Sequence, residues 1–117
     1  MTKYVVVVAL VLAIVAPAAS ASPISRAQAV LKAKEYLSVS AFSYKGLIGQ
    51  LKFDGFSTSD SAYGASHAGA NWNKQAAKKA REYLHVMAFS HSGLLQQLEF
   101  DGFTPSQAAY GVHAVGL

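Results

Sequence analysis

Two aspartates at matching positions in the two halves of the chain could, by residue type, support acid–base chemistry. Asp54 and Asp101 lie 47 positions apart, and each directly precedes a glycine. A pair of carboxylates can act as general acid and general base when the fold brings them together. Aspartate before glycine is also common where a helix breaks into a turn. We interpret both aspartates as turn residues and expect no catalytic site in this chain.

The four histidines lack the spacing of a metal site. No two of them stand four residues apart, the spacing that places two imidazoles on one helix face, and the chain contains no cysteine. Zinc sites usually combine closely spaced histidine and cysteine ligands. We predict neither a metal nor another cofactor, and we interpret as solvated or partner-facing side chains His67, His85, His91 and His113.

Two serines at matching positions, Ser43 and Ser90, are candidates for a serine nucleophile. They lack the strand–turn–helix motif in which such a serine is activated. Each precedes a predicted helix, where its hydroxyl can accept a hydrogen bond from a backbone N–H of the first turn. We therefore predict helix caps at these serines, and we predict that the chain is not an enzyme.

A cluster of basic residues in the second half is the clearest candidate for a binding surface. Lys74, Lys78 and Arg81 recur at helical spacing and share one helix face, with Lys79 beside them. Trp72 lies at the junction of the two halves and has no counterpart in the first. A solvated helix face is one explanation of such a cluster. The alternative, a surface for an acidic partner protein, anionic lipid or wall polymer, makes these five residues our candidates for partner binding.

These residues belong to a sequence that repeats itself. The segment from Lys34 to Gly64 returns without a gap as Arg81 to Gly111, and all six phenylalanines fall into matched pairs. Such a repeat indicates one supersecondary unit made twice. Apolar spacing and turn residues recur, whereas surface positions differ, which favours a binding module over an enzyme.

Each copy is predicted to form three short helices, with no strand. The first helix is expected to start after Ser25 in copy one and behind an N-cap at Asn73 in copy two. The second helix follows Ser43 or Ser90 and ends at the Asp-Gly pair, whose glycine suits a left-handed helix end. The predicted fold class is all-α, with two tandem three-helix, helix-turn-helix-like repeats.

The third helix has the clearest start signal. Residues 104–107, Thr-Pro-Ser-Gln, form a predicted capping box with proline at the first helical position, and residues 57–60 form a weaker equivalent. We expect these helices to end at Gly64 and Gly111, and we expect Phe56 and Phe103 to pack back onto the preceding helices.

The first 21 residues have the features of an export signal. Lys3 precedes an apolar run from Tyr4 to Ala16, which is shorter than the roughly 20 residues that span a bilayer. Small residues at 19 and 21 suit a signal peptidase. We predict a Sec-type signal peptide at residues 1–21, cleaved after Ala21, then repeat 1 at 22–70 and repeat 2 at 71–117. An uncleaved signal-anchor is the alternative.

The chain left after this cleavage is small and mildly basic. Without Lys3 it has nine Lys and Arg against six Asp and Glu, a weaker excess than nucleic-acid-binding domains usually show. We therefore predict no nucleic-acid partner. Each repeat alone is close to the lower size limit for an independent core, so we expect the two repeats to bury surface against each other.

The repeat resembles that of the host cell surface-exposed lipoprotein family, which includes phage and prophage superinfection-exclusion proteins. Residues 33–64 match in the first copy. The positions that carry the resemblance in the second copy and its boundary are Trp72-Asn73, Gln75-Ala76, Ala80, Tyr83-Leu84, Phe89-Ser90, Gly93-Leu94-Leu95, Gln97-Leu98, Gly102-Phe103-Thr104 and Ala109-Tyr110-Gly111. The lipobox cysteine of the family is missing.

The resemblance implies a secreted or cell-surface helical protein that interferes with entry of phage DNA by binding a protein injected by the virion. Contact with the cell envelope is a second expected interaction. Our leading hypothesis is therefore an extracytoplasmic interaction module, encoded by a phage or prophage, that acts in superinfection exclusion. Two alternatives remain open: a DNA-binding protein made of two helix-turn-helix units, and a structural cell-envelope protein with no antiviral role.

Overall fold

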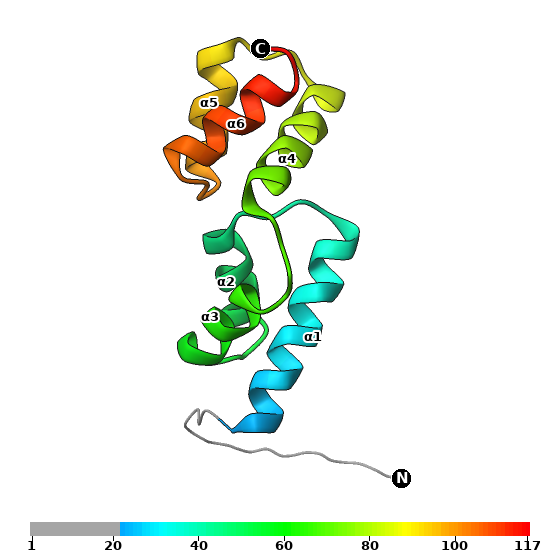
Figure 1. Cartoon of the computed structure of the whole chain (residues 1–117), viewed down its shortest axis with the longest axis vertical. Helices are drawn as coiled ribbons and strands as arrows, with labels where there is room; N and C mark the ends of the chain where they lie inside the picture. The colour runs from blue at the N-terminus through cyan, green and yellow to red at the C-terminus, as the bar shows by residue number, and fades with distance from the viewer. Residues whose placement is uncertain (1–21) are drawn as a thin grey trace, which may run out of the picture.

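The computed structural model describes residues 22–117 as six α-helices, with no strand in this part of the chain (Figure 1). The helices are α1 (Pro23–Val39), α2 (Tyr44–Phe53), α3 (Thr58–Ser66), α4 (Trp72–Val86), α5 (His91–Phe100) and α6 (Pro105–Ala114). The first three form one unit and the last three another, so the predicted all-α fold of two tandem three-helix repeats is confirmed. The predicted signal peptide, residues 1–21, lies outside the described residues.

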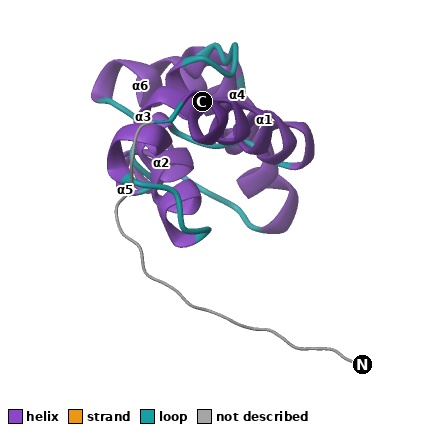
Figure 2. Cartoon of the chain, turned by 90° about the horizontal axis from the view of Figure 1, so that it is seen from below, coloured by secondary structure: helices purple, strands orange, loops and turns teal. Residues whose placement is uncertain are grey.

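The two units are stacked end to end along the long axis of a molecule that measures 56 × 28 × 20 Å (Figure 1). Seen from one end, α1 and α4 fall on one side of the molecule and the shorter helices on the other (Figure 2). The second unit therefore follows the first with a similar orientation, as expected for tandem copies of one supersecondary unit.

Side-chain caps set the helix starts. The hydroxyls of Ser43 and Ser90 accept hydrogen bonds from the N–H groups of the third helical residues, at 2.9 and 3.0 Å, which confirms both predicted caps. Thr104 and Gln107 form the predicted capping box of α6, with N–H···O distances of 3.2 and 3.0 Å. Ser57 caps α3 in the same way.

The starts of α1 and α4 differ from the prediction. α1 begins at Pro23, two residues before Ser25, with Ser22 as its N-cap. The N-cap of α4 is Asn71 and not Asn73, because the Asn71 side chain accepts from the N–H of Lys74 at 3.0 Å. Trp72 is thereby part of the first helical turn.

Each unit has its own core of small residues on the long helix and leucines on the second. In the second unit, Leu94 and Leu98 are fully buried against Ala76 and Ala80, and Phe103 closes the cluster. The first unit repeats this arrangement with Ala33, Leu47 and Leu51, against which Phe56 packs. Both phenylalanines pack as predicted.

Two glycines predicted to end the third helices lie inside them instead. A Cβ atom on Gly64 would lie 2.7 Å from the backbone carbonyl of Ala29, and one on Gly111 would lie 2.8 Å from that of Ala76. These glycines therefore let α3 approach α1, and α6 approach α4, more closely than any side chain would allow. Gly55 and Gly102 adopt a left-handed conformation, each with φ near +104°, as predicted for the Asp-Gly turns.

The two units bury surface against each other, as expected, but they do not share one core. Their core clusters are separate, because each unit already closes its own leucines with aromatic side chains. Several hydrogen bonds cross the joint between them. Gln75 accepts from the N–H of Phe42 at 3.0 Å, and Glu82 accepts from the N–H of Ala41 at 3.1 Å.

Candidate functional site

Three of the predicted partner-binding residues form an exposed basic face on α4. The side chains of Lys74, Lys78 and Arg81 are all exposed, and none of them takes part in an ion pair within residues 22–117. The buried side of the same helix carries Ala76 and Ala80. The inner face of α4 therefore packs in the core, and its outer face carries three positive charges. No acidic side chain pairs with them in the described part of the chain.

Unlike these three residues, Lys79 has an acidic and an aromatic neighbour. Its Nζ atom lies 3.5 Å from an oxygen of Glu82 and 5.7 Å from the centre of the Tyr83 ring. Glu82 in turn accepts hydrogen bonds from the first unit. Lys79 therefore pairs within α4 with a residue of the joint, and Glu82 partly balances its charge.

Trp72 packs within the molecule. Its ring contacts Tyr44 edge-on, with ring centres 5.5 Å apart, and it lies against the core cluster of the first unit although it belongs to α4. Aromatic pairs of this geometry are stabilising beyond the apolar area that they bury. The structure thus places Trp72 at the joint, where it ties the second unit to the first.

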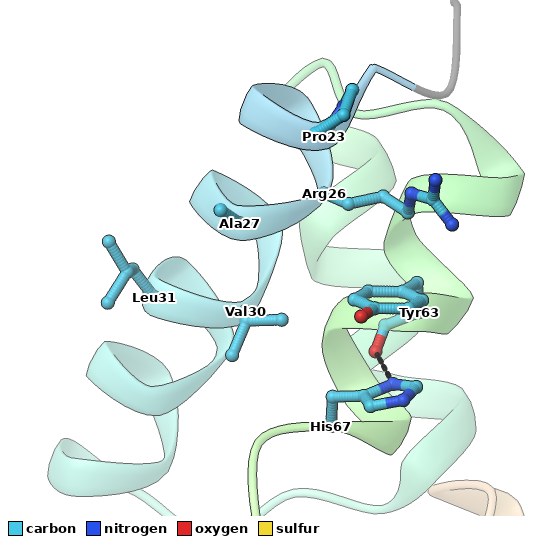
Figure 3. A pocket seen from close by; sticks show the side chains of 7 residues that line it. All are labelled: Pro23, Arg26, Ala27, Val30, Leu31, Tyr63 and His67. Atoms are coloured by element: carbon cyan, nitrogen blue, oxygen red, sulfur yellow. Dashed lines mark hydrogen bonds between the residues drawn. The ribbon is translucent and has the colours of Figure 1, made fainter.

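The corresponding side of α1 is mostly apolar, although Arg81 corresponds to the exposed Lys34. A shift of 47 positions takes Lys74 and Lys78 to Ala27 and Leu31, which border an open hollow of about 580 Å³ between α1 and α3 (Figure 3). Its lining residues are Pro23, Arg26, Ala27, Val30, Leu31, Tyr63 and His67. The two repeats therefore present different chemistry from the same place in the fold.

Stacked side chains form one wall of this hollow. The His67 ring stacks on Tyr63 with ring centres 3.9 Å apart, and the Arg26 guanidinium lies 5.1 Å from the centre of the Tyr63 ring (Figure 3). His67 is held by a 2.9 Å contact between Nδ1 and the Tyr63 carbonyl oxygen. The second unit keeps Tyr110 but has Asn73 and Ala114 in place of Arg26 and His67, so the stack is not repeated.

Sequence reasoning missed a pair of exposed aromatic residues. Phe53 and Phe100, which end α2 and α5, are 86% and 87% exposed. Each lies two residues after a buried leucine, and two residues turn an α-helix by about 200°, which places them on the opposite face. That spacing is the signal that could have identified them as surface residues. They are two further candidates for contact with a partner.

The aspartates that could have suggested catalysis hold each unit together. The Tyr83 hydroxyl donates a hydrogen bond to the Asp101 carboxylate, and Tyr36 donates to Asp54 at 2.5 Å. Burial, together with the hydrogen bond to Asp101, raises the pKa of Tyr83 to about 12. The hydrogen bond to Asp54 also raises the pKa of Tyr36. Both phenols therefore stay protonated at neutral pH and act as donors to the Asp-Gly turns.

The histidines do not converge. Within residues 22–117 no group of three or more histidine and acidic side chains is placed to hold a metal ion. His91 contacts the backbone oxygen of Leu117 at 3.0 Å, and His67 belongs to the stack described above.

The comparisons with known proteins agree with the tandem architecture. The sequence model of a family described as host cell surface-exposed lipoprotein matches residues 25–67 and again residues 71–115, one match for each three-helix unit. The chain belongs to this family. No curated protein matches the chain significantly.

A solved structure from the same group of proteins resembles the chain over both units. It is that of Ltp, a superinfection exclusion protein from the Streptococcus thermophilus temperate phage TP-J34. The two are 37% identical, with a TM-score of 0.73, and the match covers 82% of this chain and 98% of the Ltp chain in that structure. The family name places its members at the host cell surface.

Two observations concern attachment to a membrane, by a lipid and by a spanning helix. The 117 residues contain no cysteine, so they offer no lipobox acceptor for a lipid. Among the described helices, none is both long enough and apolar enough to cross a membrane.

Proposed function

We propose that this protein acts outside the host membrane in superinfection exclusion, where it binds a protein partner and blocks the entry of phage DNA. The observation that carries the proposal is the similarity to Ltp, which extends over nearly all of the Ltp chain in the solved structure and includes both units.

The partner in this proposal is a protein that the incoming virion injects. Such a protein must pass the host envelope before the DNA does, so a binder outside the membrane meets it early. Cleavage of the signal after Ala21 releases the protein on that side of the membrane, and contact with the envelope then keeps it near the entry site. Neither a nucleic acid nor a cofactor is part of this mechanism.

The exposed basic face of α4 is the surface that we assign to the partner. Lys74, Lys78 and Arg81 project from a helix whose opposite side is fixed in the core, so their charges are held in a defined arrangement. A cationic face of this kind attracts an acidic protein surface and favours it over a neutral or basic one. Trp72 supports this face by fixing the start of α4 against the first unit, and Lys79 pairs within α4 with Glu82, which takes part in the joint.

A plating assay tests the proposal. A lawn of host cells that produce the protein is challenged with a panel of phages related to the one that encodes it, and a lawn with an empty vector serves as the control. We expect plating to fall for some of these phages while adsorption to the cells stays normal. Unchanged plating for every phage, with the protein confirmed in the envelope or medium, would contradict the proposed function.

A further inference from the structure

The joint between the two units is a head-to-tail contact. The far end of the first unit supplies donors, the N–H groups of Ala41 and Phe42 and the hydroxyl of Ser43. The near end of the second unit supplies acceptors, and they are Gln75, Glu82 and the backbone oxygen of Asp101, at 3.0, 3.1 and 2.6 Å from their donors. Different surfaces thus meet across the joint, so the contact is heterologous.

Because the sequence repeats, each unit carries both a donor surface and an acceptor surface like those that form the joint. The acceptor residues of the second unit correspond, 47 positions earlier, to Gln28, Glu35 and Asp54, which have the same residue types. The donor positions of the first unit correspond to Ala88, Phe89 and Ser90 in the second. The molecule therefore carries one unused acceptor surface on its first unit and one unused donor surface on its second.

Burial shows that these two surfaces are open. Within the joint, Ala41 and Ser43 are only 1% and 2% exposed, whereas their counterparts Ala88 and Ser90 are exposed. Glu82 is 38% exposed in the joint, and its counterpart Glu35 is 69% exposed. The N–H groups of Ala88 and Phe89 donate to no other residue in the described part of the chain.

Apolar side chains accompany the unused donor surface. An open hollow of about 540 Å³ at this end of the second unit is bordered by Met87, Ala88 and Phe89. The flanking Leu84, Val86 and Leu117 are exposed. Exposed apolar residues around unpaired N–H groups are typical of a surface that another protein covers.

We propose that copies of this chain associate head to tail, with Gln28, Glu35 and Asp54 of one copy on Ala88, Phe89 and Ser90 of the next. The partner is a second copy because the contact continues one that already exists between the units. A heterologous contact that does not close leaves the same two surfaces free at the ends, so the product is a short open array.

The contact between copies is weaker than the joint inside the chain. Trp72, which packs on Tyr44 in the joint, corresponds to Ser25, and Ser40, which donates to Glu82, corresponds to Met87. The joint also benefits from the short linker, which gives its two surfaces a high effective concentration. Association therefore depends strongly on protein concentration, and retention of many copies at one surface favours it.

Sedimentation velocity on residues 22–117, which contain all six described helices, measures this association over a wide concentration range. We expect the average mass to rise with concentration. Glu35→Ala removes a charged hydrogen-bond acceptor. A hydrogen bond to a charged group contributes about tenfold or more to affinity, so this variant should associate at least that much more weakly. Ala88→Arg should abolish association, because the corresponding Ala41 has no room for a larger side chain. Lys32→Ala is the matched control for the first, since it breaks the 3.3 Å ion pair to Glu35 and the contact with the Tyr36 ring but leaves the three acceptors in place.

A mixture of the two defective variants gives the sharpest test. Ala88→Arg keeps an intact acceptor surface and Glu35→Ala keeps an intact donor surface, so an equimolar mixture should form heterodimers and nothing larger. Circular dichroism should show that each variant is folded, as expected for changes at exposed positions. A monomeric wild type at all concentrations would overturn the proposal. So would association that survives both substitutions, or a mixture that stays monomeric.

Discussion

Replacing Phe103 with alanine should lower the free energy of unfolding by about 3–5 kcal/mol, the range for removal of a large buried aromatic side chain. Phe103 is only 3% exposed and packs with Leu94 and Leu98 in the core of the second unit. That core consists of few large side chains, so neighbouring residues have little freedom to fill the space. The loss is a large fraction of the roughly 5–15 kcal/mol that stabilises a typical domain.

The chain offers a close control three residues earlier. Phe100 is 87% exposed at the end of α5, so Phe100→Ala should change the stability by less than about 0.5 kcal/mol. Urea or thermal unfolding followed by circular dichroism measures both variants. Similar stabilities for the two would mean that Phe103 is not a core residue.

Charge reversal on the basic face should remove protection against phage without unfolding the protein. Lys74, Lys78 and Arg81 are exposed and make no ion pair within residues 22–117, so each change to glutamate should alter stability by less than about 0.5 kcal/mol. An acidic partner would be repelled by the new charges. We expect the triple variant to keep its melting temperature near that of the wild type, while plating returns to the level seen without the protein.

A triple variant of the first unit controls for net charge. Lys34, Lys45 and Lys52 are also exposed, and their change to glutamate alters the total charge by the same amount. This variant should retain protection. If both triple variants fold and protect fully, the basic face is not the contact surface, and Phe53 and Phe100 become the next candidates.

The parts of the fold that depend on local chemistry could be predicted from the sequence. The caps at Ser43, Ser90 and Thr104 require only a hydroxyl and the first helical turn, so the residues themselves identify them. The start of α4 could not be predicted so well, because two asparagines flank Trp72 and either can cap a helix. Packing of Trp72 on Tyr44 accompanies the choice of Asn71, and that contact is tertiary.

Features that depend on contacts between helices could not be predicted from the sequence. Gly64 and Gly111 are typical helix-ending residues by type, and only the close approach of α3 to α1 and of α6 to α4 explains their position inside helices. The hollow beside Tyr63 depends on the same packing. The basic face could be predicted because its residues share one helix. The internal role of Trp72 depends on a contact between the units, and that of Lys79 depends on Glu82, which contacts the first unit.

Entry of phage DNA into cells that produce the protein is the most direct test of the proposed function. Cells are infected synchronously with a phage whose plating falls, unadsorbed particles are counted, and external DNA is digested before the internal phage DNA is quantified. Normal adsorption with little internal phage DNA is the predicted result. Normal adsorption with the same amount of internal DNA as in cells lacking the protein would show that any protection acts after entry, and would contradict exclusion at the cell surface.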